Sequence, residues 1–507
     1  MNIKPRLLIL ALLLANTIVT VSAQHQHRGE CGVTYEMEQQ LPVYSKKDVQ
    51  LFKEANSERF ASINIPVMFH TVANSVGEGR VKRKDILKSL CRMNNDYAEH
   101  GVVYYLKDGG FNELDNSNIF SNVSMNGDLV QTFKDGAAVD IFITENADTG
   151  SSLGTTLGFY SPGGDYIIIR KKEMADSSGT MSHEVGHYFS LRHPHSGWDQ
   201  PYDIETYGNS VPFNTVPGTG ALIELMDGSN CEDSGDKICD TAPDYLLGFT
   251  TQSCFDNFGV FDPNGDALES DETLSMGYFN NCPKYVFSPQ QIDRAKLNIA
   301  SPGRDFLLNT YTPNETEITG DLAIISPGFQ ETVETYNGVE VSWEGVQDAD
   351  LYLVEIVNFA DPADFYEYTT PNEALFVTDL EPNKVYFLNV KPYNDAYTCY
   401  PEVGLPFLTG DVETSLNDPS FVSDFVVYPN PSYTNQDIIV DMTSEWSGNA
   451  TLSISDLAGK VIKHQAIQIS NGKQQLVTNQ SGNIQSGIYF LKLSTVQGNV
   501  TRKIVIQ

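Results

Sequence analysis

The stretch from Ser182 to His195 reads SHEVGHYFSLRHPH and holds four of the nine histidines of the chain. His183 and His187 are four residues apart, so on a helix their side chains point the same way, one turn apart. Two imidazoles placed like this can bind one zinc ion, and Glu184 can take a proton from a water at the metal without being a ligand itself. The spacing HExxH therefore predicts a metal-dependent hydrolase.

A third ligand is expected shortly after this helix. His193 follows His183 by ten residues, and Pro194 prevents the helix from continuing. A chain that leaves the helix earlier can bring His193 back to the metal, which leaves one coordination position for water, as catalytic zinc needs. His195 is the alternative third ligand, whereas we expect His70, near the end of a strand, to be packed or exposed.

The elements that must position these histidines form an α/β arrangement. The apolar runs INIPVMFHTV, VVYYL, VDIFIT and DYIIIR predict strands, and the histidine helix follows them. Apolar residues at helical spacing predict another helix over 82–101, which ends at Gly101. On that helix Cys91 is interpreted as a small buried residue.

The pattern becomes all-β after about residue 312. Short apolar segments separated by turn residues predict a β-sandwich over 320–411. The polar stretch DVETSLNDPS follows, and a second β module is predicted over 425–507.

Length, charge and the N-terminus restrict the possible functions further. A chain of 507 residues suggests about three domains, and its net charge of -34 makes nucleic acid an unexpected partner. A signal peptide is predicted over 1–23, because the basic residues Lys4 and Arg6 are followed by the apolar run 7–14 and by small residues before position 24. A membrane anchor is the alternative, although polar residues interrupt the run. No other stretch can span a membrane, so the mature protein is expected outside the cytoplasm, without a transmembrane segment and with disulfides possible.

Seven cysteines are present, and four of them lie between Cys231 and Cys282. These four, namely Cys231, Cys239, Cys254 and Cys282, are expected to form two disulfides, for which three pairings are possible. Cys31 stands alone near the start of the mature chain.

The motif HExxHxxxxxH resembles the zinc motif of the metzincin metalloproteases, and three further segments resemble their pappalysin branch. These segments are CEDSGDKICDTAPD, LSMGYFNNC and FSPQQIDRA, which come in the family's order and spacing. The resemblance covers about residues 60–310. It implies a metzincin-like zinc protease domain over 60–312, with a mixed twisted sheet and an active-site helix.

The resemblance also implies roles for single residues. His183, His187 and His193 would bind one Zn²⁺, with Glu184 as general base and acid. Met276 would lie under the metal in the Met-turn, and Tyr278 would hydrogen-bond the oxyanion.

One residue departs from the family pattern. Ser190 stands where the family has glycine, at a left-handed turn, which costs a serine roughly 1 kcal/mol or more.

Further expectations concern latency and calcium. Pappalysin-type precursors carry a Cys-Gly pair, so Cys31 is a candidate cysteine switch in a propeptide over 24–59, which would be removed near Arg59. Family members bind calcium near the first segment, which points to Asp236, Asp240 and Thr241. The alternative is a solvated acidic loop.

Two expectations remain for the loops of this domain. We expect the pairings Cys231–Cys254 and Cys239–Cys282, stapling the long loops. Asn280 and Asn281 stand where acidic residues favour arginine substrates in the family, which suggests a weaker arginine preference.

The β modules carry resemblances of their own. Residues 320–411 resemble a fibronectin type III domain, with Trp343 as core tryptophan and Tyr386 at a tyrosine corner. Residues 425–507, with VYPNP, SISDLAGKVI and SGIYFLKLST, resemble the C-terminal sorting domain of the type IX secretion system. This implies the outer-membrane secretion machinery as a partner.

The sequence thus predicts a secreted or cell-surface zinc endopeptidase, made as a latent precursor, with proteins or peptides as substrates. The alternative is a surface binding or adhesion protein in which the β modules act and the protease domain is inactive or minor.

Overall fold

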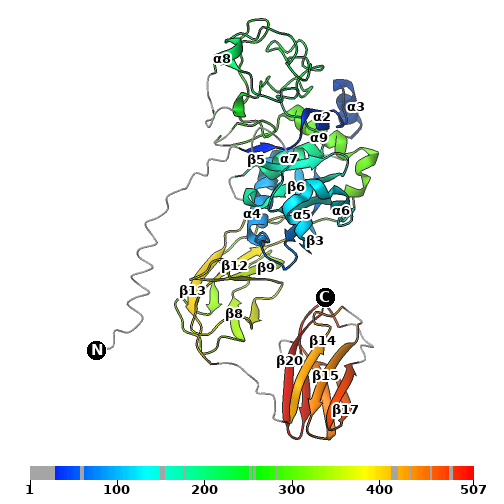
Figure 1. Ribbon diagram of the computed structural model, residues 1–507, viewed down its shortest axis with the longest axis vertical. Coiled ribbons are helices and arrows are strands. Elements are labelled where there is room, and N and C mark those ends of the chain that lie inside the picture. Colours follow the sequence, from blue (N-terminus) through cyan, green and yellow to red (C-terminus); the bar gives the residue numbers. More distant parts are fainter. Residues whose placement is uncertain are drawn as a thin grey trace, which may run out of the picture. The chain divides into compact units, whose positions relative to one another are not determined.

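The structure is a computed structural model that describes most of the chain (Figure 1). The described residues are 29–56, 62–148, 155–174, 178–249, 254, 258–279, 282, 284–412, 421–433, 436–456, 460–478 and 484–506. The predicted signal peptide, the activation site near Arg59, and Asn280 and Asn281 lie outside them. The chain divides into two compact units, one of 1–326, 342–375 and 387–405, the other of 327–341, 376–386 and 406–507.

The first unit contains a mixed six-stranded sheet in the order β1-β5-β6-β4-β2-β3. Its strands are β1 (Gly29–Cys31), β2 (Ile63–Ala73), β3 (Val102–Asp115), β4 (Val139–Thr144), β5 (Thr155–Ser161) and β6 (Tyr166–Arg170). Strands β3, β2, β4 and β6 are parallel, and β5 runs antiparallel to β6. The central strands are buried runs of Ile, Val and Phe, as strands covered on both faces require.

Helices accompany this sheet. They are α2 (Tyr35–Glu38), α3 (Lys46–Asn56), α4 (Arg83–Tyr97), α5 (Ser117–Asn122), α6 (Gly127–Gln131), α7 (Thr180–Tyr188), α8 (Ile204–Tyr207) and α9 (Pro289–Ile299). Of these, α4, α5 and α7 contact its strands. Helix α7 lies against β5 and β6 and beside α4, which packs on β3 (Figure 1). Short 3-10 turns are η1 (Ala98–His100), η2 (Val123–Asn126), η3 (Lys171–Glu173), η4 (Leu247–Phe249) and η5 (Pro302–Leu307). The α/β expectation for this part of the chain agrees with the structure.

The region predicted as a fibronectin-like sandwich forms two small sheets, β10-β9-β12-β13 and β11-β8-β7. The strands are β7 (Ile324–Ser326), β8 (Val339–Trp343), β9 (Leu351–Asn358), β10 (Phe365–Thr370), β11 (Ala374–Val377), β12 (Val385–Tyr393) and β13 (Val403–Leu408). Trp343 is buried against Tyr352, and the Tyr386 hydroxyl accepts the amide N–H of Glu381 at 2.9 Å. This last contact is the one that a tyrosine corner makes.

The remainder of the second unit also consists of two sheets, β14-β15-β18 and β17-β16-β19-β20. Its strands are β14 (Val422–Tyr428), β15 (Ile438–Ser444), β16 (Gly448–Ser455), β17 (Val461–Ile469), β18 (Gly472–Thr478), β19 (Gly487–Thr495) and β20 (Gly498–Ile506). Alternating apolar residues from both sheets share one core, among them Val440, Leu452 and Leu491. In the described part of the whole chain, no helix combines the length and apolarity that a membrane span needs.

The disulfides differ from the expected pairings. Cys231 is bonded to Cys239 and Cys254 to Cys282, so the predicted pairs Cys231–Cys254 and Cys239–Cys282 are wrong. The prediction assumed that disulfides close long loops, whereas tight turns between Cys231 and Cys239 bring their Cα atoms to 5.2 Å.

The interpretation of Cys91 as a buried thiol is also wrong. Cys91 on α4 is bonded to Cys399, 308 residues later. The same helix N-terminus carries Lys82 and Lys84, which both pair with the buried carboxylate of Glu355 on β9. One disulfide and the two ion pairs to the buried Glu355 therefore attach the first-unit part of the sandwich to α4.

Candidate metal centre and active site

Helix α7 presents His183 and His187 on one face, and a left-handed turn then reverses the chain toward His193. Ser190 has φ = 69°, its N–H donates to the carbonyl of His187 at 2.9 Å, and the N–H of Leu191 donates to the carbonyl of Gly186 at 2.9 Å. This is a Schellman motif, in which the residue after the C-cap adopts the left-handed conformation. The strained backbone expected at Ser190 is present.

A buried hydrogen bond accompanies the strained turn. The Ser190 hydroxyl accepts the Nδ2–H of Asn298 on α9 at 2.7 Å. Glycine at this position would relax the backbone but could not form this bond.

Three imidazole nitrogens converge at the end of this turn. The Nε2 atoms of His183, His187 and His193 lie 3.0–3.2 Å from one another, and all three side chains are buried. His195 does not join them but stacks on His193 with a ring distance of 4.5 Å. Its Nδ1 lies 3.4 Å from Asp244 Oδ2.

Each converging imidazole has an acceptor at its other nitrogen. His183 Nδ1 lies 2.7 Å from the carbonyl of Ser275, and His187 Nδ1 lies 2.8 Å from that of Leu191. His193 Nδ1 lies 2.7 Å from Glu38 Oε1. Because these acceptors bind a proton on Nδ1, the three Nε2 atoms carry lone pairs that point at a common centre.

These nitrogens fit a zinc ion. A tetrahedral ion bonded to imidazoles at about 2.0–2.1 Å would hold the nitrogens roughly 3.3–3.4 Å apart, close to the spacing observed. Without a cation, three buried lone pairs would repel one another. Burial lowers the pKa of His183 to about 4 and the pKa values of His187 and His193 well below the usual range, so all three imidazoles are neutral at pH 7, the state in which an imidazole can bind a metal.

Cys31 completes the cluster from the N-terminal strand β1. Its Sγ and the three histidine nitrogens lie within 4.8 Å of one another. Its thiol is free, and burial, followed by the charge of Glu184, raises its pKa. A divalent cation at the centre would reverse this effect and favour the thiolate.

Glu184 lies beside the cluster without joining it. Its Oε2 accepts the Cys31 S–H at 3.5 Å, and its Oε1 is buried with no hydrogen-bond partner among the described residues. Burial raises the pKa of Glu184 to about 8. A carboxyl of this pKa can both take and return a proton near neutral pH.

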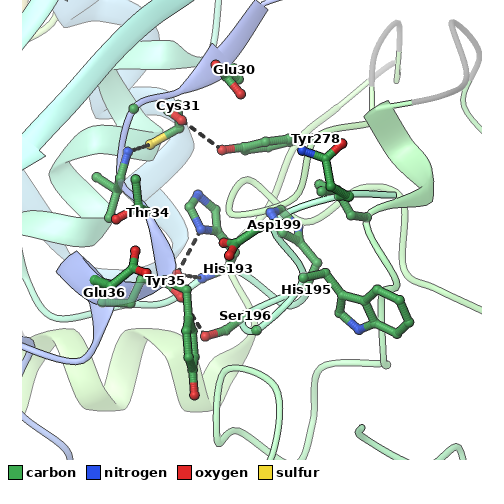
Figure 2. A pocket seen from close by; sticks show the side chains of 17 residues that line it. Glu30, Cys31, Thr34, Tyr35, Glu36, His193, His195, Ser196, Asp199 and Tyr278 are labelled. Carbon is green, nitrogen blue, oxygen red and sulfur yellow. Dashed lines mark hydrogen bonds and ion pairs between the residues drawn. The ribbon is translucent and has the colours of Figure 1, made fainter. Parts of the chain in front are cut away.

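Met276 packs against helix α7, and Tyr278 lies beside the histidines. Met276 is fully buried, and a Cβ added to Gly186 would come within 2.4 Å of its sulfur. Gly186, in the middle of HEVGH, is thus the residue that lets the methionine approach the helix. Tyr278 packs its ring against His193 at 5.1 Å, and its hydroxyl donates to the carbonyl of Cys31 at 3.1 Å (Figure 2).

Residues 29–38 cover this site. Strand β1 pairs in parallel with β5, which would be the edge strand of the sheet without it, and the N–H of Gly32 donates to the carbonyl of Gly158 at 2.8 Å. Helix α2 follows and buries Glu38 beside His193. The segment lines a cavity of about 360 Å³ together with His193, His195, Trp198 and Tyr278 (Figure 2).

Of the three residues expected to bind calcium, Asp236 and Thr241 lie together and Asp240 turns elsewhere. Asp236 is buried, accepts the Ile238 N–H and the Thr241 hydroxyl on Oδ1, and has no partner for Oδ2 among the described residues. The buried Glu224, which the sequence analysis missed, lies beside it, and burial raises the pKa values of both carboxyls. Asp240 instead accepts from Ser288 Oγ and the N–H of Gln290 at the start of α9.

Sequence reasoning also missed Glu38 and Gly186. No spacing rule connects Glu38 to His193, since they are 155 residues apart. The glycine inside HEVGH could have indicated a close approach to the helix. His70 is packed, as expected, with its Nε2 2.7 Å from the buried Asp140.

Comparison with known proteins identifies the C-terminal module. Residues 426–507 match the family described as "Secretion system C-terminal sorting domain". This segment belongs to that family. The protein is therefore exported, to the cell surface or beyond it.

A further similarity covers part of the chain and concerns a relative whose activity is described. The extracellular metalloprotease of Colletotrichum graminicola is 24% identical over 260 residues, which cover 43% of this chain and 88% of that protein. The protein is thus similar to a secreted metalloprotease.

Solved structures show weaker likenesses. Mature mirolysin of Tannerella forsythia, in complex with a cleaved peptide, has a TM-score of 0.32 and 17% identity, covering 48% of this chain and 95% of that chain. A promirolysin mutant from the same organism has a TM-score of 0.30 and 16% identity, covering 55% and 96%.

Proposed function

We propose that this chain is a zinc-dependent endopeptidase of the metzincin type, secreted as a latent precursor. The observation that carries the proposal is the convergence of three neutral imidazole nitrogens beside a buried glutamate. A single Zn²⁺ would be held by His183, His187 and His193, with Met276 as the floor of the site. Bound there, zinc would polarise a peptide carbonyl and acidify water.

The chain's own residues would handle the protons and the developing charge. Glu184 would take the proton of the attacking water and deliver it to the leaving amine. The Tyr278 hydroxyl, once released from the carbonyl of Cys31, would donate to the oxyanion. The edge of β5 would pair with the extended backbone of a peptide or protein substrate.

Latency would follow from the position of residues 29–38. Strand β1 occupies the edge of β5, and the Cys31 sulfur lies where the fourth zinc ligand would be. The segment 24–59 is accordingly proposed as a propeptide whose removal frees both the metal and the substrate edge.

A second cation is proposed in the lower part of this domain. Glu224 and Asp236 are two buried acids: the Glu224 carboxylate lies against Gly235, and burial together with the charge of Asp236 raises its pKa. Two buried like charges that interact in this way need a cation or a proton. With Thr241 they would form part of a Ca²⁺ site, whereas Asp240 caps α9.

The assignment of domains follows the same reasoning. We propose the protease over 60–312, a fibronectin type III-like region over 320–411 and the sorting domain over 425–507, which would be recognised by the type IX export machinery.

The test compares the matured wild type with Glu184→Ala from which an added protease has removed the propeptide, and uses Glu205→Ala, an exposed glutamate, as the control. An unfolded protein is the substrate, and zinc content is measured in parallel. We expect cleavage by the wild type and the control that a chelator abolishes, and none by Glu184→Ala although it keeps its zinc. Zinc without cleavage in the matured wild type would contradict the proposal and favour a surface binding protein.

A further inference from the structure

We propose that Glu38 of the propeptide is a positioning residue for the zinc site. This inference rests on the function proposed above. The Glu38 carboxylate holds the third histidine and makes the precursor the tighter zinc binder. The propeptide would therefore do more than block the metal with Cys31.

Glu38 is among the most enclosed carboxylates of the precursor. It is 1% exposed, at the end of α2. Its Oε1 accepts both the Nδ1–H and the backbone N–H of His193, at 2.7 and 2.8 Å, and its Oε2 accepts the hydroxyl of Ser196. A buried carboxylate with three donors is well compensated, so this contact is built into the fold.

The three histidines differ in what supports them. His183 and His187 donate to the carbonyls of Ser275 and Leu191, which belong to the protease domain and remain after activation. Only His193 donates to a side chain of the propeptide. Removal of the propeptide would therefore take away the hydrogen-bond acceptor of His193 and leave those of His183 and His187 in place.

This asymmetry has a consequence for metal binding. A carboxylate acceptor fixes the tautomer and orientation of a ligating histidine and increases its basicity, and loss of such a partner typically costs 10–100-fold in metal affinity. The precursor offers four ligands with all three histidines supported, as closed zinc sites do. Zinc would accordingly be acquired by the precursor, before activation.

The experiment measures zinc affinity of the full precursor by competition with a chelator, and Co²⁺ absorption as a second readout. Every variant carries Glu184→Ala, which prevents self-cleavage. The test variants are Glu38→Ala and Glu38→Gln, each with and without Cys31→Ser, and the control is Glu36→Gln, an exposed residue of the same helix.

We expect Glu38→Ala to weaken zinc binding 10–100-fold, Glu38→Gln to weaken it less because its amide oxygen still accepts, and the control to change nothing. A persisting Co²⁺–thiolate band would show that the site is still assembled. Affinity within twofold of the parent would overturn the inference. So would an effect of Glu38→Ala that vanishes with Cys31→Ser, because Glu38 would then act only by placing Cys31. No zinc in the parent would instead sink the proposed function itself.

Discussion

Ser190 allows a test of how the chain turns after the active-site helix. The left-handed conformation costs a residue with a Cβ roughly 1–2 kcal/mol, and glycine avoids this cost. The hydrogen bond from Asn298 contributes about 0.5–1.5 kcal/mol, and leaving the buried amide unsatisfied costs about 1–3 kcal/mol. Since the two effects are of similar size, the serine hydroxyl offsets the strain of its own backbone.

Two substitutions separate the cost of the left-handed backbone from the contribution of the hydrogen bond. Ser190→Gly loses the bond but relieves the strain, so we expect stability within about 1 kcal/mol of the parent. Ser190→Ala loses the bond and keeps the strain, so we expect it to be about 1–2 kcal/mol less stable than Ser190→Gly. For a domain of this size, that difference corresponds to a shift in Tm of roughly 2–8 °C.

The assay is thermal unfolding of the precursor in a Glu184→Ala background, with the zinc content checked for each variant. Equal melting temperatures for the glycine and alanine variants would refute the claim of backbone strain. A glycine variant more stable than the parent by over about 1 kcal/mol would refute the compensating bond.

Three further predictions concern the Cys31 thiol, the disulfide between Cys91 and Cys399, and the buried acids Glu224 and Asp236. Cys31→Ser should cleave substrate and mature sooner than the wild type, by N-terminal sequencing over time; an unchanged delay would argue against the cysteine block. Replacing both Cys91 and Cys399 by serine opens a loop of 308 residues, for which the chain-entropy model gives about 5–6 kcal/mol, and measured losses of disulfides are about 2–5 kcal/mol. A shift of less than about 1 kcal/mol in urea unfolding would contradict a structural role. Burial raises the pKa values of Glu224 and Asp236, so without calcium the folded state holds protons that the unfolded state has lost, and stability should fall as pH rises above about 4. Calcium at 100 times its Kd should restore about 2.7 kcal/mol near pH 7; no calcium-dependent rise in Tm would rule the site out.

The sequence could predict what depends on local spacing. Helical periodicity places His183 and His187 on one face, and Pro194 requires the chain to turn, so the direction of His193 was accessible before the structure. The positive φ of Ser190 was expected from the resemblance, because the family has glycine there. Contacts between distant segments were not accessible in this way. The pairing of Cys91 with Cys399 and the bond between Glu38 and His193 depend on how separate elements pack, and no periodicity encodes that.

The pairing of Glu224 with Asp236 likewise could not be predicted from the sequence. Asp236 lies in a recognisable segment, but Glu224 stands alone in the sequence, and only packing brings it to the same buried place. Asp240, predicted from the same segment, turns instead toward the start of α9.

The central claim is that three histidines hold zinc and that Cys31 occupies its fourth position until the propeptide is removed. X-ray absorption at the zinc edge, recorded on the precursor and on the matured protein, tests it most directly. We expect one zinc per chain, with one sulfur at about 2.3 Å in the precursor and none after maturation. Zinc with only nitrogen and oxygen neighbours in the precursor, or no zinc at all, would contradict it.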